Sequence, residues 1–130
     1  MKYSLFKLSI VFFLSLLASC TKHNQEIIPD PSGRWEASKD IGGEYQGSIF
    51  IPGNGNIFEF EASSFKRFQT GTLIESGFYK LIKEPFENFS YRLILNNDYN
   101  TRYFLNVDNN NLIIATDGII KTVRLYTRIP

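Results

Sequence analysis

The chain has 130 residues, with 14 lysines and arginines, 13 acidic residues, one histidine and one cysteine. This length suits one small domain. The charges are nearly balanced and dispersed, which excludes the clustered basic residues of a nucleic-acid-binding face. A single cysteine cannot form a disulfide within the chain, and a single histidine falls short of the three or four converging ligands of a metal site. We therefore expect no cofactor and no nucleic acid partner.

The first 20 residues resemble the signal of bacterial lipoproteins. Lys2 and Lys7 precede a short apolar run, and Leu17-Ala18-Ser19-Cys20 resembles the lipobox at which such signals are cleaved. The apolar run is shorter than the roughly 20 residues that a transmembrane helix needs. The resemblance implies that residues 1–19 are a signal peptide and that the thiol of Cys20 receives a lipid. An ordinary secretory signal with a chance cysteine is the alternative.

A lipid on Cys20 predicts where the protein resides. Each buried methylene contributes about 0.8 kcal/mol, so two or three acyl chains anchor a protein stably and one chain does not. Surface-exported lipoproteins of Bacteroidetes carry an acidic run near this cysteine, whereas Thr21-Lys22-His23-Asn24-Gln25 has no acidic residue. We therefore expect the domain to lie in the bacterial cell envelope, at the outer membrane and facing the periplasm. It should contact the membrane through the lipid on Cys20. We also expect it to be a monomer.

Residues 20–32 are expected to form the lipidated N-terminus and a flexible tether. The segment is polar and contains Pro29 and Pro31, a composition typical of linkers. His23 lies in this segment, where we expect it to be inert. Loss of the signal peptide removes two lysines, so the formal net charge falls from +1 to −1.

From residue 33 onward, the sequence predicts short strands separated by turns. Aromatic and β-branched residues are frequent, and asparagine and glycine cluster between them. Ile57-Phe58-Glu59-Phe60-Glu61 alternates with a period of two, which indicates a strand with one buried face. The expected strands cover residues 34–39, 45–51, 57–61, 65–69, 72–83, 90–95, 101–107, 112–116 and 121–128, with a loop at 84–89 and a hairpin turn at Asp117-Gly118.

The predicted fold is all-β. No segment is long enough for a helix that crosses between parallel strands, so neighbouring strands should pair antiparallel. A meander of this size avoids exposed edges by closing on itself. We therefore expect an antiparallel up-and-down meander that closes into a small β-barrel of about eight strands.

Two motifs resemble those of the lipocalin family. Gly33-Arg34-Trp35 resembles the Gly-x-Trp motif on the first strand of lipocalins, and Arg128 resembles the arginine that packs against that tryptophan from the last strand. The stretch 57–83 is similar to lipocalin-like lipoproteins of Bacteroidetes. The resemblance implies that residues 33–130 form a lipocalin-like barrel, in which Trp35 plugs the closed end and the Arg128 guanidinium lies over the indole. Gly33, Trp35 and Arg128 are then structural residues.

The sequence does not offer a set of residues suited to catalysis, so we do not expect an enzyme. His23 lies in the tether, and a serine nucleophile would therefore have no histidine base. Glu59 and Glu61 lie on the face opposite the phenylalanines, where we expect them to be solvated. Asp108-Asn109-Asn110-Asn111 offers oxygen atoms but lacks the glycine and the closing glutamate of a calcium-binding EF-hand loop.

Two functions stay open. The first is a lipid-anchored binding module whose barrel holds a small apolar or amphipathic ligand. The second is an envelope module that binds a protein or glycan, with a filled barrel and no small-molecule ligand. Nine phenylalanines follow residue 20, and the volume left between inward side chains decides between the two. The candidate ligand-binding residues are Phe58, Phe60, Phe78, Tyr91 and Tyr103, within a wider inward set that also includes Phe65, Phe68, Leu93, Leu105, Val123 and Leu125.

Overall fold

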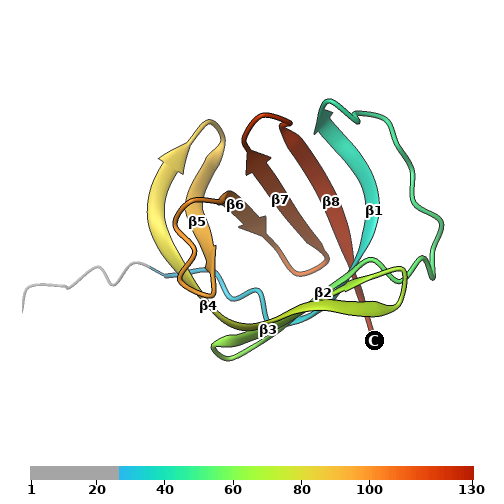
Figure 1. Ribbon diagram of the computed structural model, residues 1–130, viewed down its shortest axis with the longest axis horizontal. Helices are drawn as coiled ribbons and strands as arrows, with labels where there is room; N and C mark the ends of the chain where they lie inside the picture. The colour runs from blue at the N-terminus through green and yellow to red at the C-terminus, as the bar shows by residue number, and fades with distance from the viewer. Residues whose placement is uncertain (1–26) are drawn as a thin grey trace, which may run out of the picture.

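The computed structural model describes residues 27–130, which form one closed barrel of eight antiparallel strands (Figure 1). Each strand pairs with its neighbours in sequence, and β8 also pairs with β1. The expected all-β meander of about eight strands is confirmed, and the described residues contain no helix. The strands are β1 (Gly33–Gly43), β2 (Ile57–Glu61), β3 (Ser64–Gln69), β4 (Thr72–Phe86), β5 (Phe89–Leu95), β6 (Arg102–Val107), β7 (Asn111–Asp117) and β8 (Thr122–Ile129).

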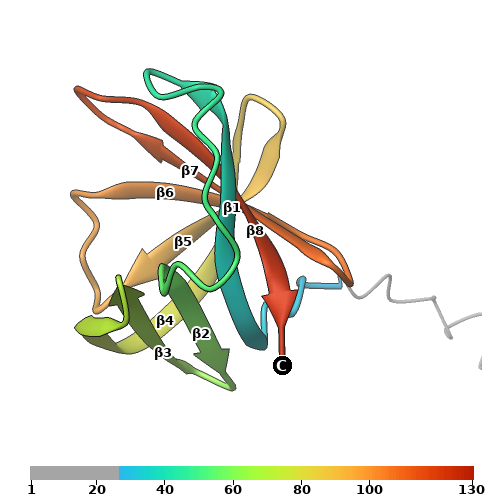
Figure 2. The same ribbon diagram turned by 90° about the vertical axis from the view of Figure 1, so that its right-hand side faces the viewer.

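The connections between strands define two ends of the barrel. In an up-and-down meander, alternate connections lie at the same end. The β1–β2, β3–β4, β5–β6 and β7–β8 connections therefore share one end, which we call the open end. The β2–β3 and β6–β7 turns and both termini of the described chain share the other, the closed end. The β4–β5 hairpin instead folds over the outer face, where Glu87 pairs with Lys121 of the β7–β8 connection. Figure 2 shows the β5–β6 and β7–β8 connections on the left and the N-terminal segment on the right.

Trp35 fills the closed end and has no exposed surface. Its indole Nε1 donates a hydrogen bond to the carbonyl of Pro31 (2.8 Å), and the Cζ of Arg128 lies 4.1 Å from the ring centroid. Arg128 also donates from Nε to the carbonyl of Asn109 (2.8 Å) and from Nη1 to that of Ser32 (2.9 Å). The expected contact between Trp35 and Arg128 is thus present. It joins β1, β8, the N-terminal segment and the β6–β7 turn.

Gly33 is required for this arrangement. Its φ is +131°, and a Cβ atom at this position would lie 2.3 Å from Nη1 of Arg128. A side chain here would therefore push the guanidinium away from Trp35, and the backbone conformation itself favours glycine. The spacing of Gly33 and Trp35 has a direct physical cause, because the glycine leaves room for the arginine that covers the indole.

The last six residues of the expected tether contact the barrel. Residues 27–32 have no regular secondary structure, but Pro31 is buried and the hydroxyl of Tyr91 donates to the carbonyl of Ile27 (3.4 Å). The carboxylate of Asp30 accepts hydrogen bonds from the hydroxyl and the backbone N–H of Ser32, and these bonds lower its pKa. The chain is therefore held in place from Ile27 onward. The other tether residues and Cys20 lie outside the described residues.

Apolar side chains from every strand pack inside the barrel. The rings of Phe58 and Phe60 stack with centroids 5.4 Å apart. Tyr126 meets Phe58 edge-on at 5.6 Å, and Tyr79 meets Phe60 in the same way at 5.0 Å. The buried members are Trp35, Ala37, Phe58, Phe60, Phe65, Leu93, Leu95, Leu105, Leu112, Ile114 and Tyr126, with Phe50, Tyr79, Leu81, Tyr103 and Val107 packed against them.

A second apolar cluster lies on the outer face of β6, β7 and β8. Phe104 has no exposed surface although its neighbours Tyr103 and Leu105 point inward, so alternation places Phe104 outside. The β4–β5 hairpin covers it, because Phe86 stacks on Phe104 with centroids 4.5 Å apart and Phe89 packs alongside. The remaining members are Ala115, Ile113 and Val123. The outer face of the barrel is thus partly core.

The expected strand over Tyr45–Ile51 is wrong. Residues 44–56 form an irregular connection, with one isolated bridge between Lys39 and Ile49. Pairing between β1 and β2 ends at Glu36, and the loop satisfies backbone groups of β1 beyond that point; the N–H of Phe50, for example, donates to the carbonyl of Ser38 (2.9 Å). The apolar residues of this loop imitate a strand pattern, but beyond Glu36 the bulged edge of β1 takes only separate hydrogen bonds from them and no regular ladder.

Two strand boundaries also differ from the expectation. β1 continues past Asp40 to Gly43, through register shifts between Ala37 and Lys39 and between Asp40 and Gly42. The loop expected at 84–89 is a tight hairpin, because β4 extends to Phe86, which pairs with Phe89 at the start of β5. Bulges in both strands preserve the pairing where the sequence signals a break.

Three residues expected inside the barrel lie outside it. Phe78 is 72% exposed, because Tyr79 takes the inward position on β4. Val123 packs in the outer cluster and Leu125 shares its face, whereas Tyr126 on the same strand is part of the interior. Adjacent apolar residues make both faces of such strands look alike in sequence, and a shift of one residue inverts the whole strand.

Candidate ligand site at the open end of the barrel

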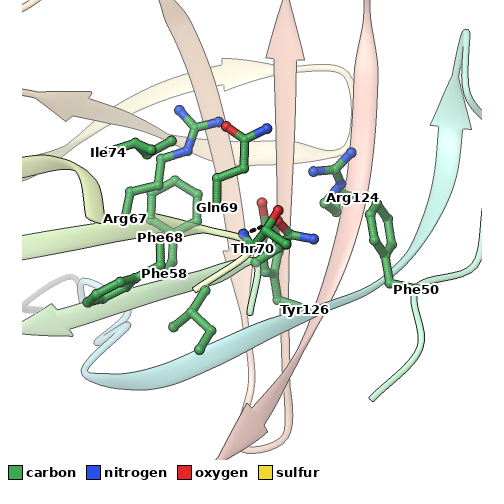
Figure 3. Close-up of a pocket in the computed structure, with 11 residues that line it drawn as sticks. Phe50, Phe58, Arg67, Phe68, Gln69, Thr70, Ile74, Arg124 and Tyr126 are labelled. Atoms are coloured by element: carbon green, nitrogen blue, oxygen red, sulfur yellow. Dashed lines mark hydrogen bonds between the residues drawn. The ribbon is translucent and has the colours of Figure 1, made fainter. Parts of the chain in front are cut away.

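Two adjoining cavities lie toward the open end. Their volumes are about 290 Å³ and 180 Å³. Both are lined by Phe58, Arg67, Arg124 and Tyr126, so we treat them as one site and call it the mouth site. The larger cavity is also lined by Phe50, Asn56, Ile57, Phe68, Gln69, Thr70 and Ile74, and the smaller one by Tyr103, Ile114, Thr116 and Thr122. Figure 3 shows the guanidinium groups of Arg67 and Arg124 on either side of Gln69, carried by β3 and β8.

Arg124 is fixed by a buried carboxylate. Its Nε and Nη2 donate to the two oxygens of Asp40 at 2.7 and 3.2 Å, and Asp40 is 2% exposed. Burial lowers the pKa of Arg124, but the hydrogen bonds to Asp40, its charge and the interactions with Tyr126 together outweigh burial, and the pKa is raised overall. Burial also raises the pKa of Tyr126, against the opposing charges of Arg124 and Arg67. At neutral pH the mouth site therefore presents charged arginines and a neutral tyrosine hydroxyl.

Arg67 is held more loosely than Arg124. Its guanidinium lies over the ring of Phe58, with Cζ 5.3 Å from the centroid. Its nearest carboxylate among the described residues is that of Glu75, at 3.9 Å, and both side chains are about one third exposed. An ion pair of this length and exposure contributes little. Arg67 is thus the cation of the mouth site whose hydrogen-bonding capacity is least used.

The β1–β2 connection forms one wall of the mouth site. The carboxylate of Glu36, which is 8% exposed, accepts hydrogen bonds from the N–H groups of Gly53 (2.7 Å) and Gly55 (3.3 Å). These bonds hold the loop against β1. Phe50 then lies beside Arg124, with 4.5 Å between the Cζ atom and the ring centroid. The guanidinium of Arg124 is therefore positioned by a carboxylate and an aromatic ring together.

Exposed apolar side chains are frequent at the open end. Of the eleven large apolar side chains that are exposed among residues 27–130, eight lie in or beside the four connections of the open end. The most exposed are Ile119 in the β7–β8 turn, and Ile49 and Ile51 in the β1–β2 connection. We call the eight residues the apolar rim: Tyr45, Ile49, Ile51, Leu73, Ile74, Tyr99, Ile119 and Ile120. The open end thus combines a basic, polar interior with an apolar border.

A further cavity of about 290 Å³ lies at the closed end, between the N-terminal segment and β4. Ile28, Pro29 and Pro31 line one side, and Tyr79 and Leu81 line the other. No pair of converging cations lines it. We regard it as the space left where the segment crosses the barrel.

The five residues that the sequence predicts as ligand contacts do not lie together in the structure. Phe58 and Tyr103 line the mouth site. Phe60 is buried in the core beneath it, Tyr91 contacts the N-terminal segment, and Phe78 points to solvent. Two of the five candidates therefore lie at the site.

Sequence reasoning missed the polar residues of the mouth site. Arg67, Arg124 and Tyr126 point inward because they alternate with outward neighbours on β3 and β8. On β8 the sequence Val123-Arg124-Leu125-Tyr126 fits two opposite registers equally well, and the apolar pair was assigned inward. The available signal was the alternation of Arg124, Tyr126 and Arg128, which places three polar side chains on one face of the strand.

Residues 27–130 include no cluster of His, Cys, Asp and Glu that could hold a metal ion. None of their segments is a helix long and apolar enough to cross a membrane. In comparisons with known proteins, no family model, no curated protein and no solved structure matches this chain.

Proposed function

We propose that the chain is a lipid-anchored binding module of the bacterial cell envelope, and that it takes a small amphipathic molecule in the mouth site. The observation that carries the proposal is the convergence of Arg67 and Arg124 on a cavity that four aromatic side chains also line, beside polar and aliphatic residues. Apolar side chains fill most of the barrel, so the cavity at the open end is the space that a ligand can enter. Pockets of this kind, with a few placed polar groups, are typical of ligand sites.

Native mass spectrometry tests this function directly. The chain is purified without detergent, and its mass is compared before and after mild denaturation. We expect a copurified small molecule, or a shift in Trp35 fluorescence when amphipathic molecules of either charge are added. If no molecule copurifies and no member of such a panel shifts the fluorescence, the proposal is contradicted.

The anchoring part of the proposal depends on Cys20. A Cys20→Ser chain should be released from the membrane fraction, because the lipid would have no thiol to attach to. A variant that stays with the membrane as firmly as the wild type refutes lipid attachment. In intact cells, the domain should resist added protease if it faces the periplasm, and its digestion would place it on the cell surface.

A second candidate function is an envelope module that binds a protein or a glycan. The apolar rim favours it, since exposed apolar side chains gathered at one end of a domain often mark an interaction site. This reading predicts that the rim is required for capture of one defined partner. It also predicts that substitution of Arg67 inside the mouth site leaves the capture unchanged.

A further inference from the structure

We infer that the mouth site takes an anionic amphiphile head-first, with the acid group at Arg67 and Arg124 and the apolar chain lying over the apolar rim. This inference rests on the proposed function and adds the charge of the ligand and its orientation. The ligand class is a single acid group, carboxylate, phosphate or sulfate, on an extended apolar chain. It follows from where the molecule places its polar and its apolar surfaces.

The interior of the mouth site suits the head of such a molecule. Guanidinium groups present planar pairs of donors that match carboxylate and phosphate oxygens. Arg67 supplies one such group with its donors little used, and Arg124 supplies another that Asp40 holds in a fixed position. Tyr126 lines both cavities together with the two arginines. An anion between them would meet donors from β3 and β8.

The mouth site is small and shallow. Its two cavities, of about 290 and 180 Å³, together reach only the lower part of the range of about 300–1,000 Å³ for pockets that enclose a whole drug-sized molecule. Beneath the cavities, Phe58, Phe60 and Tyr126 are packed ring against ring. Because these rings close the way deeper into the barrel, a chain whose head lies between the arginines extends toward the open end.

The apolar rim offers a surface for that remainder. Ile74, which belongs to the rim, also lines the larger cavity. A chain leaving the cavity therefore passes from a polar interior onto exposed isoleucine and leucine side chains. Covering them removes apolar surface from water, which is favourable in proportion to the area covered. The reverse orientation would place the apolar chain between two arginines and the acid group on the rim.

Glu75 makes the inference testable in two directions. Its carboxylate is the described acidic partner of Arg67, at 3.9 Å, so it competes with the acid group of a ligand. Arg67→Gln should weaken binding of an anionic amphiphile, and Glu75→Gln should strengthen it. Lys66 is the matched control, because it lies next to Arg67 on β3, is exposed and points outward.

The experiment measures the affinities of dodecanoic acid, dodecyl phosphate, dodecyl sulfate and dodecanol by Trp35 fluorescence, with all variants made in the Cys20→Ser chain. A hydrogen bond to a charged group contributes about 1.5–3 kcal/mol, so Arg67→Gln should weaken acid binding about tenfold or more. Arg67→Lys should keep part of the affinity, and Lys66→Gln should keep all of it. Dodecanol should bind more weakly, and its affinity should not change with either Gln variant.

Bromine-labelled acids report the orientation. Trp35 is the only tryptophan of the chain, and in the β1–β2 register it lies opposite Phe58, which lines the mouth site. The inference expects 2-bromododecanoic acid to quench Trp35 more strongly than 12-bromododecanoic acid. Stronger quenching by the 12-bromo acid overturns the orientation. Equal affinity for dodecanol and the acids, or an unchanged affinity in a folded Arg67→Gln variant, overturns the anionic class. If none of these molecules binds, both the proposed function and the inference are wrong.

Discussion

Replacing Trp35 tests the closed end of the barrel most directly. Trp35→Ala removes a side chain with no exposed surface, and such changes cost about 3–5 kcal/mol. The variant also loses the hydrogen bond from Nε1 to Pro31, which contributes about 1 kcal/mol, and leaves Arg128 without the ring beneath it. A small domain is stable by only about 5–15 kcal/mol. We therefore expect Trp35→Ala to be folded marginally at best.

Trp35→Phe separates packing from hydrogen bonding. It keeps an aromatic ring beneath Arg128 and removes the Nε1 donor and part of the ring volume, so its loss should be about 1–2 kcal/mol. Chemical denaturation followed by circular dichroism measures both variants, in the chain from Gln25 onward. For a domain of this size, a loss of 3 kcal/mol corresponds to a fall in Tm of roughly 12 °C or more. A Trp35→Ala variant within about 1 kcal/mol of the wild type would falsify the assignment of Trp35 as the plug of the closed end.

Four further outcomes follow from the contacts described. Gly33→Ala should destabilise the domain by about 1–3 kcal/mol in the same denaturation assay, because a Cβ atom there meets Arg128; an unchanged midpoint contradicts this. Asp40→Asn should lower the free energy of unfolding by about 2–4 kcal/mol, since it breaks the ion pair between this buried carboxylate and the partly buried Arg124; an unchanged free energy would show that this pair is not needed. Phe78→Ser should change the free energy of unfolding by less than about 0.5 kcal/mol, because Phe78 is exposed, and a larger loss would mean that it packs in the core. The backbone N–H groups of Asn110 and Asn111 lower the pKa of Asp108 in the folded state. The stability from these bonds is present above the ordinary value of 3.8 and is lost as the pH falls through the folded-state pKa. Melting curves in acid should therefore show a smaller pH dependence for Asp108→Asn, and identical curves would contradict this.

The sequence was sufficient to predict the barrel, because its clearest signal is local. Ile57–Glu61 alternates without ambiguity, and the structure places Phe58 and Phe60 inside as the pattern requires. The absence of a long helical pattern and the density of turns then left closure of a meander as the remaining solution. The pairing of Trp35 with Arg128 followed from a resemblance, and its geometry explains the need for Gly33.

The barrel could be predicted because its signal is local, and the mouth site could not be predicted because it depends on contacts that are not local. Alternation assigns a face only when one face is clearly polar, and β8 carries Val123 and Leu125 on one face and Arg124 and Tyr126 on the other. Which face points inward depends on β1, whose Asp40 is buried and binds Arg124 across the sheet. Such a choice is made by contacts between residues far apart in sequence, and local patterns do not contain them.

The seam between β1 and β8 makes completion of the barrel depend on the last residues of the chain. Every other pairing joins neighbouring strands, whereas this one joins Gly33–Gly43 to Thr122–Ile129. Contacts of such sequence separation form late, because a long loop must close first. Until β8 arrives, β1 and β7 each present an unpaired edge that can pair with another chain. A chain that lacks its last strand should therefore aggregate rather than fold more slowly.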